Sequence, residues 1–198
     1  MDPLLDFPLN PCVKGFPQDA PPLRLREVGE QGWNLFHGHL GSPVAVLRRE
    51  VMDENARWMR DFLRRSGASL CPHGKTTLAP QLFHRQLQDG AWGLTLATPT
   101  QAQMAFHYGI PRVLLANEVV DAAALRGLSR TVDADSQREL WVFADSREAV
   151  EIMATHWCAE KPLNVLVETG IAGGRCGARS IAEAMDVARA VKASPKLR

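Results

Sequence analysis

The sequence predicts an α/β fold built on a parallel sheet. Short apolar runs typical of buried strands recur along the chain, and helical patterns of about three turns separate them. Polar capping residues and glycine stops mark the ends of several of these helices. Strands joined by helices in this way pair in parallel through right-handed crossovers. An open doubly wound sheet and a closed barrel both fit this local pattern.

Composition narrows the functional classes. The 198 residues are 45% hydrophobic and 23% charged, and the net charge of +1 favours neither nucleic acid nor an anionic membrane as a partner. No apolar run approaches the ~20 residues of a membrane span, and the amino terminus does not read as a signal peptide. The four cysteines form no CxxC pair and no metal-ligand spacing, so we predict free thiols and a cytoplasmic protein.

Residues 1–42 are predicted to form a proline-rich arm, and residues 43–198 the main domain. Proline prevents a long helix in the arm, while apolar side chains give it surface to bury. We expect the arm to wrap the body of the protein or a neighbouring subunit. Its prolines are Pro3, Pro8, Pro11, Pro17, Pro21 and Pro22.

The first elements after the arm are a strand at 44–47 and a helix from about Asp53 to Arg65, whose apolar residues recur at helical spacing. A buried strand near 69–71 follows. Pro72 and Gly74 then break regular structure, and Thr77 is the expected cap of the next helix.

The pattern of a short strand followed by a helix then repeats four times. Strands are predicted at 93–97, 113–116, 140–144 and 165–168. Each precedes a helix, and three of these helices start with a polar cap. The expected caps are Thr98 with Gln101, Asp145 with Glu148, and Ser180 with Glu183, and the helix after 113–116 is expected from about Asp121.

Lys75 lies in the loop between the strand near 69–71 and the following helix. Loops at the carboxyl ends of parallel strands are where α/β proteins place their chemistry. Position alone nevertheless favours a solvated surface lysine. The neighbouring Gly74 allows close approach of the backbone to a ligand.

An ordered set of motifs favours a functional role for Lys75 over that of a surface lysine. The set includes Pro72-His73-Gly74-Lys75-Thr76-Thr77, Gly90-Ala91-Trp92-Gly93, Leu114-Leu115-Ala116-Asn117-Glu118 and Gly173-Gly174-Arg175-Cys176-Gly177. With these motifs the chain resembles the D-serine dehydratase and D-threonine aldolase group. These are fold-type III pyridoxal phosphate enzymes related to the amino-terminal domain of alanine racemase. The resemblance covers nearly the whole chain.

The resemblance implies a (β/α)8 barrel, of which this chain holds about five strands: 69–71 and the four later ones. It assigns the strand at 44–47 to a separate carboxyl-terminal β domain. Three barrel strands and that β domain are then missing. A barrel stopped at five strands leaves an unpaired edge and an open apolar interior. We therefore expect the chain to be poorly stable by itself.

The resemblance also implies the chemistry. Lys75, its pKa lowered by burial at the barrel mouth, would form a Schiff base with pyridoxal phosphate. The expected reaction is dehydration or deamination of a D-amino acid such as D-serine to a keto acid and ammonia. Three alternatives stay open: a D-threonine aldolase-like lyase, a non-catalytic pyridoxal phosphate-binding protein, and an inactive remnant that only associates with other subunits.

Four further residues are predicted cofactor or substrate contacts. The resemblance places Arg175 against the cofactor or substrate, where a guanidinium can bind a phenolic oxygen or a carboxylate. His73, Glu168 and Asn117 are the weaker candidates. The metal ligands of the group, and most of its phosphate contacts, would lie beyond Arg198, so no metal site is predicted within the chain. The resemblance implies a homodimer for an intact member.

Overall fold

The computed structural model describes residues 6–198 and divides the chain into two compact units, residues 1–59 and 60–198. The dividing point lies within one helix, α1 (Arg49–Ser66). A dividing point inside a helix does not define where a domain begins, so the boundary between residues 42 and 43 stays a prediction. No helix in the described part of the chain is long and apolar enough to cross a membrane.

The proline-rich segment forms only short elements, because proline removes backbone donors and fixes φ. Its two short strands, β1 (Pro8–Leu9) and β2 (Leu23–Arg24), pair antiparallel. Two 3-10 helices follow, η1 (Leu25–Glu30) and η2 (Leu35–His37). The buried Phe16 ring meets Trp33 edge to face, with 5.3 Å between ring centroids.

The predicted strand at 44–47 is wrong. Residues 44–48 have no regular secondary structure, and Val46 and Leu47 are 57% and 68% exposed. A strand forms only when a partner satisfies its backbone groups, and no strand within residues 6–198 pairs with this segment. The following helix, α1, begins four residues before the predicted Asp53.

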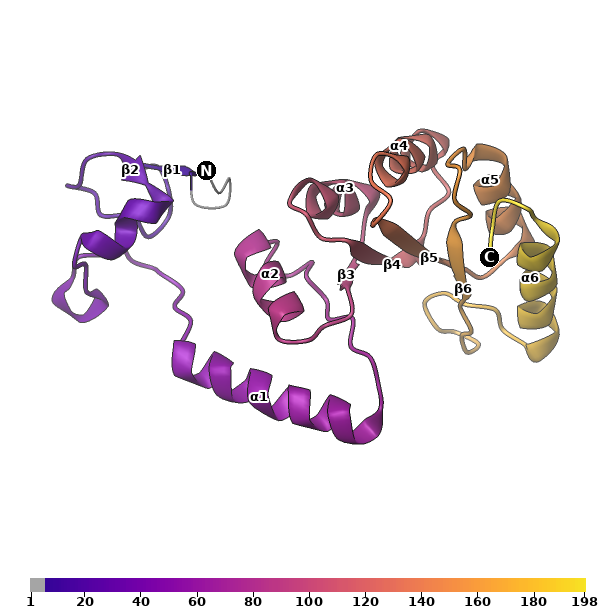
Figure 1. Cartoon of the computed structure of the whole chain (residues 1–198), viewed down its shortest axis with the longest axis horizontal. Coiled ribbons are helices and arrows are strands. Elements are labelled where there is room, and N and C mark those ends of the chain that lie inside the picture. The colour runs from indigo at the N-terminus through magenta and orange to yellow at the C-terminus, as the bar shows by residue number, and fades with distance from the viewer. Residues whose placement is uncertain (1–5) are drawn as a thin grey trace. The chain divides into compact units, whose positions relative to one another are not determined.

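The second unit carries a four-stranded parallel sheet in the order of the chain. Its helices lie along one side of the sheet (Figure 1). A doubly wound sheet would reverse its strand order and carry helices on both faces, so this arrangement is that of a barrel segment. The strands are β3 (Leu94–Leu96), β4 (Arg112–Glu118), β5 (Glu139–Ala144) and β6 (Asn164–Val167). The helices that follow them are α3 (Pro99–His107), α4 (Ala122–Asp133), α5 (Arg147–His156) and α6 (Ile181–Ala193).

The segment predicted as a strand at 69–71 runs beside β3 but is not a regular strand. The Trp92 amide donates to the Leu70 carbonyl, and the Gly74 amide donates to the Thr95 carbonyl, each over 2.8 Å. His73 forms an isolated parallel bridge with Thr95. Pro72 has no amide hydrogen to donate, which interrupts the ladder.

The next helix, α2 (Pro80–Gln88), begins at proline as the sequence indicates, but Thr77 does not cap it. Ala79 occupies the cap position and makes no side-chain hydrogen bond. Residues 75–77 instead form a turn, which the Leu78 amide closes by donating to the Gly74 carbonyl over 3.0 Å.

The core lies between the sheet and its helices. Alternate residues of β4 and β5 are fully or almost fully buried, as the two-residue period of a strand requires. The opposite face of these strands is only half-buried and faces the interior of the barrel segment. The buried strand residues are Val113, Leu115, Leu140, Val142 and Ala144.

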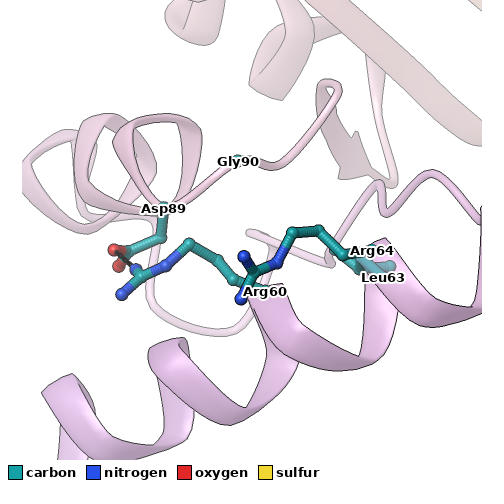
Figure 2. A pocket seen from close by; sticks show the side chains of 5 residues that line it. All are labelled: Arg60, Leu63, Arg64, Asp89 and Gly90. Carbon is teal, nitrogen blue, oxygen red and sulfur yellow. Dashed lines mark hydrogen bonds and ion pairs between the residues drawn. The ribbon is translucent and has the colours of Figure 1, made fainter.

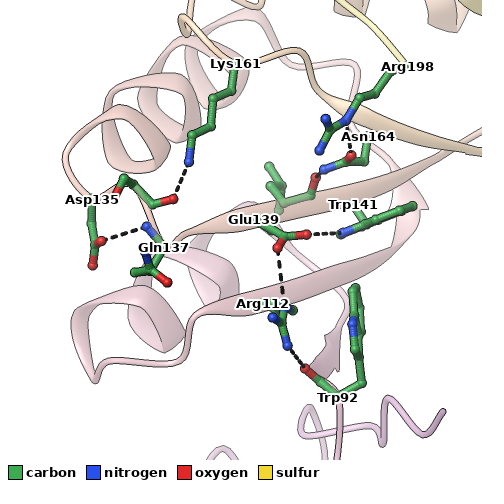
Figure 3. Close-up of polar contacts among 11 residues, drawn as sticks. Trp92, Arg112, Asp135, Gln137, Glu139, Trp141, Lys161, Asn164 and Arg198 are labelled. Carbon is green, nitrogen blue, oxygen red and sulfur yellow. Dashed lines mark hydrogen bonds and ion pairs between the residues drawn. The ribbon is translucent and has the colours of Figure 1, made fainter.

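A polar network links the amino-terminal ends of the strands (Figure 3). Arg112 pairs with Glu139 over 3.3 Å, and buried Asn164 donates to the Leu140 carbonyl over 2.9 Å. Arg198 donates to Asn164 over 2.6 Å, and residues 196–198 pair in parallel with β6. This end of the sheet is thus occupied by structural contacts, and open polar groups gather at the other end.

Two of the four predicted caps are confirmed: Thr98 and Ser180 each accept an amide of the first helical turn. Asp121, predicted only as the start of its helix, caps α4 by accepting the Ala124 amide over 2.6 Å. The cap of α5 is Ser146, not Asp145. The Ser146 hydroxyl accepts the Ala149 amide over 3.3 Å. Asp145 instead accepts a hydrogen bond from the Gly177 amide over 3.0 Å. A residue that the sequence assigns to a cap therefore belongs to the site described next.

Candidate active site

A pocket of about 320 Å³ opens at the carboxyl-terminal end of the sheet. Its walls come from the loop after residue 72, the half-buried face of the strands and the loop after β6. Four predicted site residues line it: His73, Lys75, Glu168 and Arg175. The other lining residues are Ala97, Ala116, Phe143, Gly170, Ile171, Gly174 and Cys176.

Lys75 lines this pocket from the turn at residues 75–77, with His73 on the same loop. Both side chains are exposed, so the prediction that Lys75 is buried is wrong. The turn lies beyond the carboxyl edge of the sheet, where none of the described elements covers it. The amine therefore reaches the pocket from the solvent side.

Gly74 serves a packing role that the sequence does not reveal. A Cβ atom at this residue would lie 2.5 Å from the ring of Phe83 in α2 and 3.3 Å from Leu96 in β3. Phe83 and Leu96 are fully buried. The loop before Lys75 is therefore pressed against the core, and the absence of a side chain at Gly74 makes this contact fit.

Arg175 enters the pocket from the loop after β6. The loop is closed at its base by two backbone hydrogen bonds, from the Ala178 amide to the Glu168 carbonyl (2.8 Å) and from the Gly170 amide to the Ala178 carbonyl (2.9 Å). Arg175 is exposed at the far part of the loop. Its guanidinium is available to an anionic or phenolic oxygen.

Asn117 is the one predicted residue that does not line the pocket. Its amide nitrogen donates to the Ala97 carbonyl over 3.4 Å, and its amide oxygen accepts from the Glu118 amide over 3.2 Å. These contacts join the ends of β3 and β4, so in this structure Asn117 holds the rim of the sheet.

Carboxyl groups cluster below the pocket. Glu118 ends β4, Asp145 follows β5 and Glu168 follows β6, so three neighbouring strands end in an acid. Glu118 Oε1 and Glu168 Oε2 are buried and accept no hydrogen bond. Burial, then the adjacent Glu168 carboxyl, raises the pKa of Glu118 to about 7. Near neutral pH the cluster therefore holds a proton.

Cys176 completes the cluster. Its thiol donates to Glu168 over 3.4 Å, and this hydrogen bond, followed by burial, raises the pKa of the Cys176 thiol. One ligand atom from each of Glu118, Glu168 and Cys176 lies within 4.8 Å of the others. A cation could bind there only after displacing the protons that the raised pKa values of Glu118 and Cys176 favour. We therefore interpret the cluster as a proton-sharing group that anchors the loop after β6.

Sequence reasoning missed Glu118, Asp145 and Cys176 as parts of one cluster. A signal was present, because Glu118 comes two residues after one predicted strand and Asp145 comes directly after the next. Parallel strands bring such residues to the same edge of a sheet. The sequence interpretation instead used Asp145 as a helix cap and Glu118 only as part of a motif.

A second pocket of about 400 Å³ lies beside α1 and α2 (Figure 2). It is lined by Arg60, Leu63, Arg64, Asp89 and Gly90, none of them a predicted site residue. Arg60 is paired with Asp89, and Arg64 is paired with Asp61. With its charges neutralised in this way, this pocket is a weaker candidate than the one around Lys75.

Two curated relatives of the chain are aldolases. No family model matches the chain. A 3-hydroxy-D-aspartate aldolase of Paracoccus denitrificans is 25% identical over 166 residues, which are 82% of this chain and 42% of that protein. A D-threonine aldolase of Arthrobacter sp. is 27% identical over 155 residues, which are 78% of this chain and 40% of that protein.

Solved structures of related enzymes share the fold of this chain. The crystal structure of D-threonine aldolase from Filomicrobium marinum matches with a TM-score of 0.75 and 27% identity, covering 81% of this chain and 43% of that one. The chain is homologous to the fold-type III pyridoxal phosphate enzymes. Alanine racemase from E. faecalis, at 21% identity and a TM-score of 0.59, shares the fold over 73% of this chain and 39% of the racemase.

The fold class is therefore confirmed: the second unit is a segment of the alanine racemase-type barrel. The chain spans about two fifths of the length of the curated fold-type III relatives it matches.

Proposed function

We propose that this chain contributes the lysine-bearing part of the active site in a pyridoxal phosphate-dependent lyase that acts on a D-amino acid. One observation carries the proposal: loops 100 residues apart, holding Lys75 and Arg175, line the same pocket at the carboxyl ends of the strands. The names of the relatives, which are aldolases and a dehydratase for β-hydroxy amino acids, support the reaction class.

The lining residues fit the cofactor. A volume of about 320 Å³ lies within the usual range for ligand sites, roughly 300–1,000 Å³. Lys75 supplies an amine for the aldehyde carbon. Arg175 and His73 supply donors for ring oxygens or a substrate carboxylate, and Ala97 and Ala116 leave apolar space against a ring.

When bound, pyridoxal phosphate supplies an electron sink for charge that develops at the substrate Cα. The residues of the chain have separate roles around it. Lys75 would hold the aldehyde carbon of the cofactor, and in dehydration its Nζ would take the Cα proton, which leaves with the β-hydroxyl as water. Arg175 neutralises an anionic oxygen. Glu168 keeps the loop of Arg175 attached to the cluster through Cys176.

The substrate is proposed to be a β-hydroxy D-amino acid. The aldolases of threonine and 3-hydroxyaspartate among the relatives share this feature, and D-serine has it too. Loss of the hydroxyl as water would leave an aminoacrylate, which hydrolyses to a keto acid and ammonia. Cleavage between Cα and Cβ would instead give glycine and acetaldehyde from D-threonine. Dehydration of D-serine and aldol cleavage fit the relatives equally well. We further propose a cytoplasmic homodimer for a longer protein, in which a divalent metal would bind outside this chain.

The test is an absorbance titration with pyridoxal phosphate, followed by borohydride reduction and peptide mapping. We expect a new visible or near-ultraviolet band and a stable label on Lys75. The variant Lys75→Ala should lose both, while Lys192→Ala, which removes an exposed lysine of α6, should keep both. Equal labelling of many lysines, or an unchanged spectrum in Lys75→Ala, would contradict the proposal.

A further inference from the structure

Arg179 makes an unusual set of contacts in the loop that carries Arg175. Its Nη1 donates to the Ile171 carbonyl at 2.7 Å and to the Cys176 carbonyl at 3.0 Å, and its Nη2 donates to the Gly174 carbonyl at 3.1 Å. One guanidinium thus binds three carbonyls of a single loop. The sequence gives no sign of this, because Arg179 lies outside the glycine-rich motif and next to a helix cap.

The loop is built around this guanidinium. A Cβ atom at Gly170 would lie 2.0 Å from the Cys176 carbonyl oxygen and 2.6 Å from Arg179 Nη1, and one at Gly174 would lie 3.3 Å from Arg179 Nη1. Glycine at these two positions leaves room for the side chain of Arg179. Arg175 lies between two of the bound carbonyls, those of Gly174 and Cys176.

The backbone of Arg179 is itself fixed. Its amide donates to Glu183 Oε2 over 2.7 Å in the first turn of α6, so the side chain extends from a rigid helix start. On the other side, the loop is held by the Gly177 amide on Asp145 and by the Cys176 thiol on Glu168. These anchors hold the loop near its end, whereas Arg179 reaches back to Ile171 at its start.

We infer that Arg179 is a positioning residue, which clamps the loop at residues 170–178 and thereby directs Arg175 into the pocket. This inference rests on the proposed function for the role of Arg175 but not for the clamp itself. A guanidinium with five donors in a fixed plane can bind several carbonyls at once, which the single ammonium of lysine does poorly.

The clamp is tested first without cofactor, by site-resolved alkylation. In Arg179→Met we expect Cys176 to react faster, on the order of fivefold, because opening the loop costs less free energy. Exposed Cys12 and Cys158 are internal references and should react at unchanged rates. Arg189→Met is the matched control, since Arg189 lies in the helix that follows Arg179, α6, and pairs with Asp186 over 3.3 Å. An unchanged Cys176 rate in Arg179→Met would overturn the clamp.

The positioning role is tested by a double-mutant cycle on pyridoxal phosphate affinity. If Arg179 acts through Arg175, the variants Arg175→Gln and Arg179→Met weaken binding, and the double variant is no weaker than Arg175→Gln alone. Additive losses would overturn the positioning role. An Arg175→Gln variant with unchanged affinity would instead refute the proposed contact of Arg175, and the alkylation result would still decide the clamp.

Discussion

At the scale of single residues, the pocket combines cations near its mouth with carboxyl groups below it. Lys75, Arg175 and Glu168 line the pocket, and one buried oxygen each of Glu118 and Glu168 accepts no hydrogen bond. Two adjacent carboxyl groups cannot both ionise cheaply away from water, so one retains a proton. This retained proton makes the stability of the site dependent on pH.

The sign of that dependence follows from Glu118. Its pKa is raised from 4.5 to about 7, so the folded protein holds the proton more tightly than the unfolded chain. The stability that protonated Glu118 contributes to the folded state is therefore fully present below pH 4.5 and is lost as the pH rises through about 7. Glu118→Gln should remove this dependence.

Between pH 4.5 and pH 8.5 the native chain should lose about 1 kcal/mol of unfolding free energy that Glu118→Gln keeps. This figure is reduced because the carboxyl is only partly buried. The measurement is denaturant unfolding across this pH range. Glu151→Gln serves as a control, because it removes an exposed carboxyl of α5. A parallel pH profile for the native chain and Glu118→Gln would contradict the assignment.

At the scale of elements, the lysine loop is positioned by the helix that follows it. Pro80 starts α2 without a side-chain cap, so packing rather than capping fixes where the helix lies. Phe83, fully buried, presses on Gly74 one residue before Lys75. The glycine is thus required by the packing of the helix on the loop.

Gly74→Ala should therefore destabilise the second unit by about 1–3 kcal/mol, because the added methyl group meets the Phe83 ring. Gly127→Ala is the matched control. Gly127 lies within α4, and a Cβ atom there would be in ordinary contact with the Gln103 side chain of α3, at 3.5 Å. Alanine in place of glycine stabilises a helix by up to about 1 kcal/mol. The two variants should shift the unfolding midpoint in opposite directions. A tolerated Gly74→Ala would show that Phe83 can move away without cost.

At the scale of the whole molecule, the parallel sheet and its helices supply the core of residues 60–198. Leu115 of β4 is fully buried among helix side chains, whereas Ile181 at the start of α6 is 85% exposed. Burial of apolar surface is the dominant favourable term in folding. Stability should therefore depend on the strand residues under the helices and hardly at all on the exposed face of α6.

Leu115→Ala is expected to lower the free energy of unfolding by about 2–5 kcal/mol, through lost burial and a residual cavity. Ile181→Ala, which also shortens an aliphatic side chain, should change it by no more than about 0.5 kcal/mol. Denaturant unfolding followed by near-ultraviolet circular dichroism measures both. Similar losses in the two variants would place the stabilising core elsewhere.

Local patterns alone predicted the βα repeat, two of the helix caps and the loop that holds Lys75, because periodicity and capping are local properties. They could not determine pairing: the apolar run at 44–47 resembles a strand, yet no described strand pairs with it. Nor could they show that Asp145 accepts the Gly177 amide instead of capping α5, or that the carboxyl groups of Glu118 and Glu168 lie together. Those contacts join residues 32 and 50 positions apart, and only the parallel packing of β4, β5 and β6 brings them to one edge.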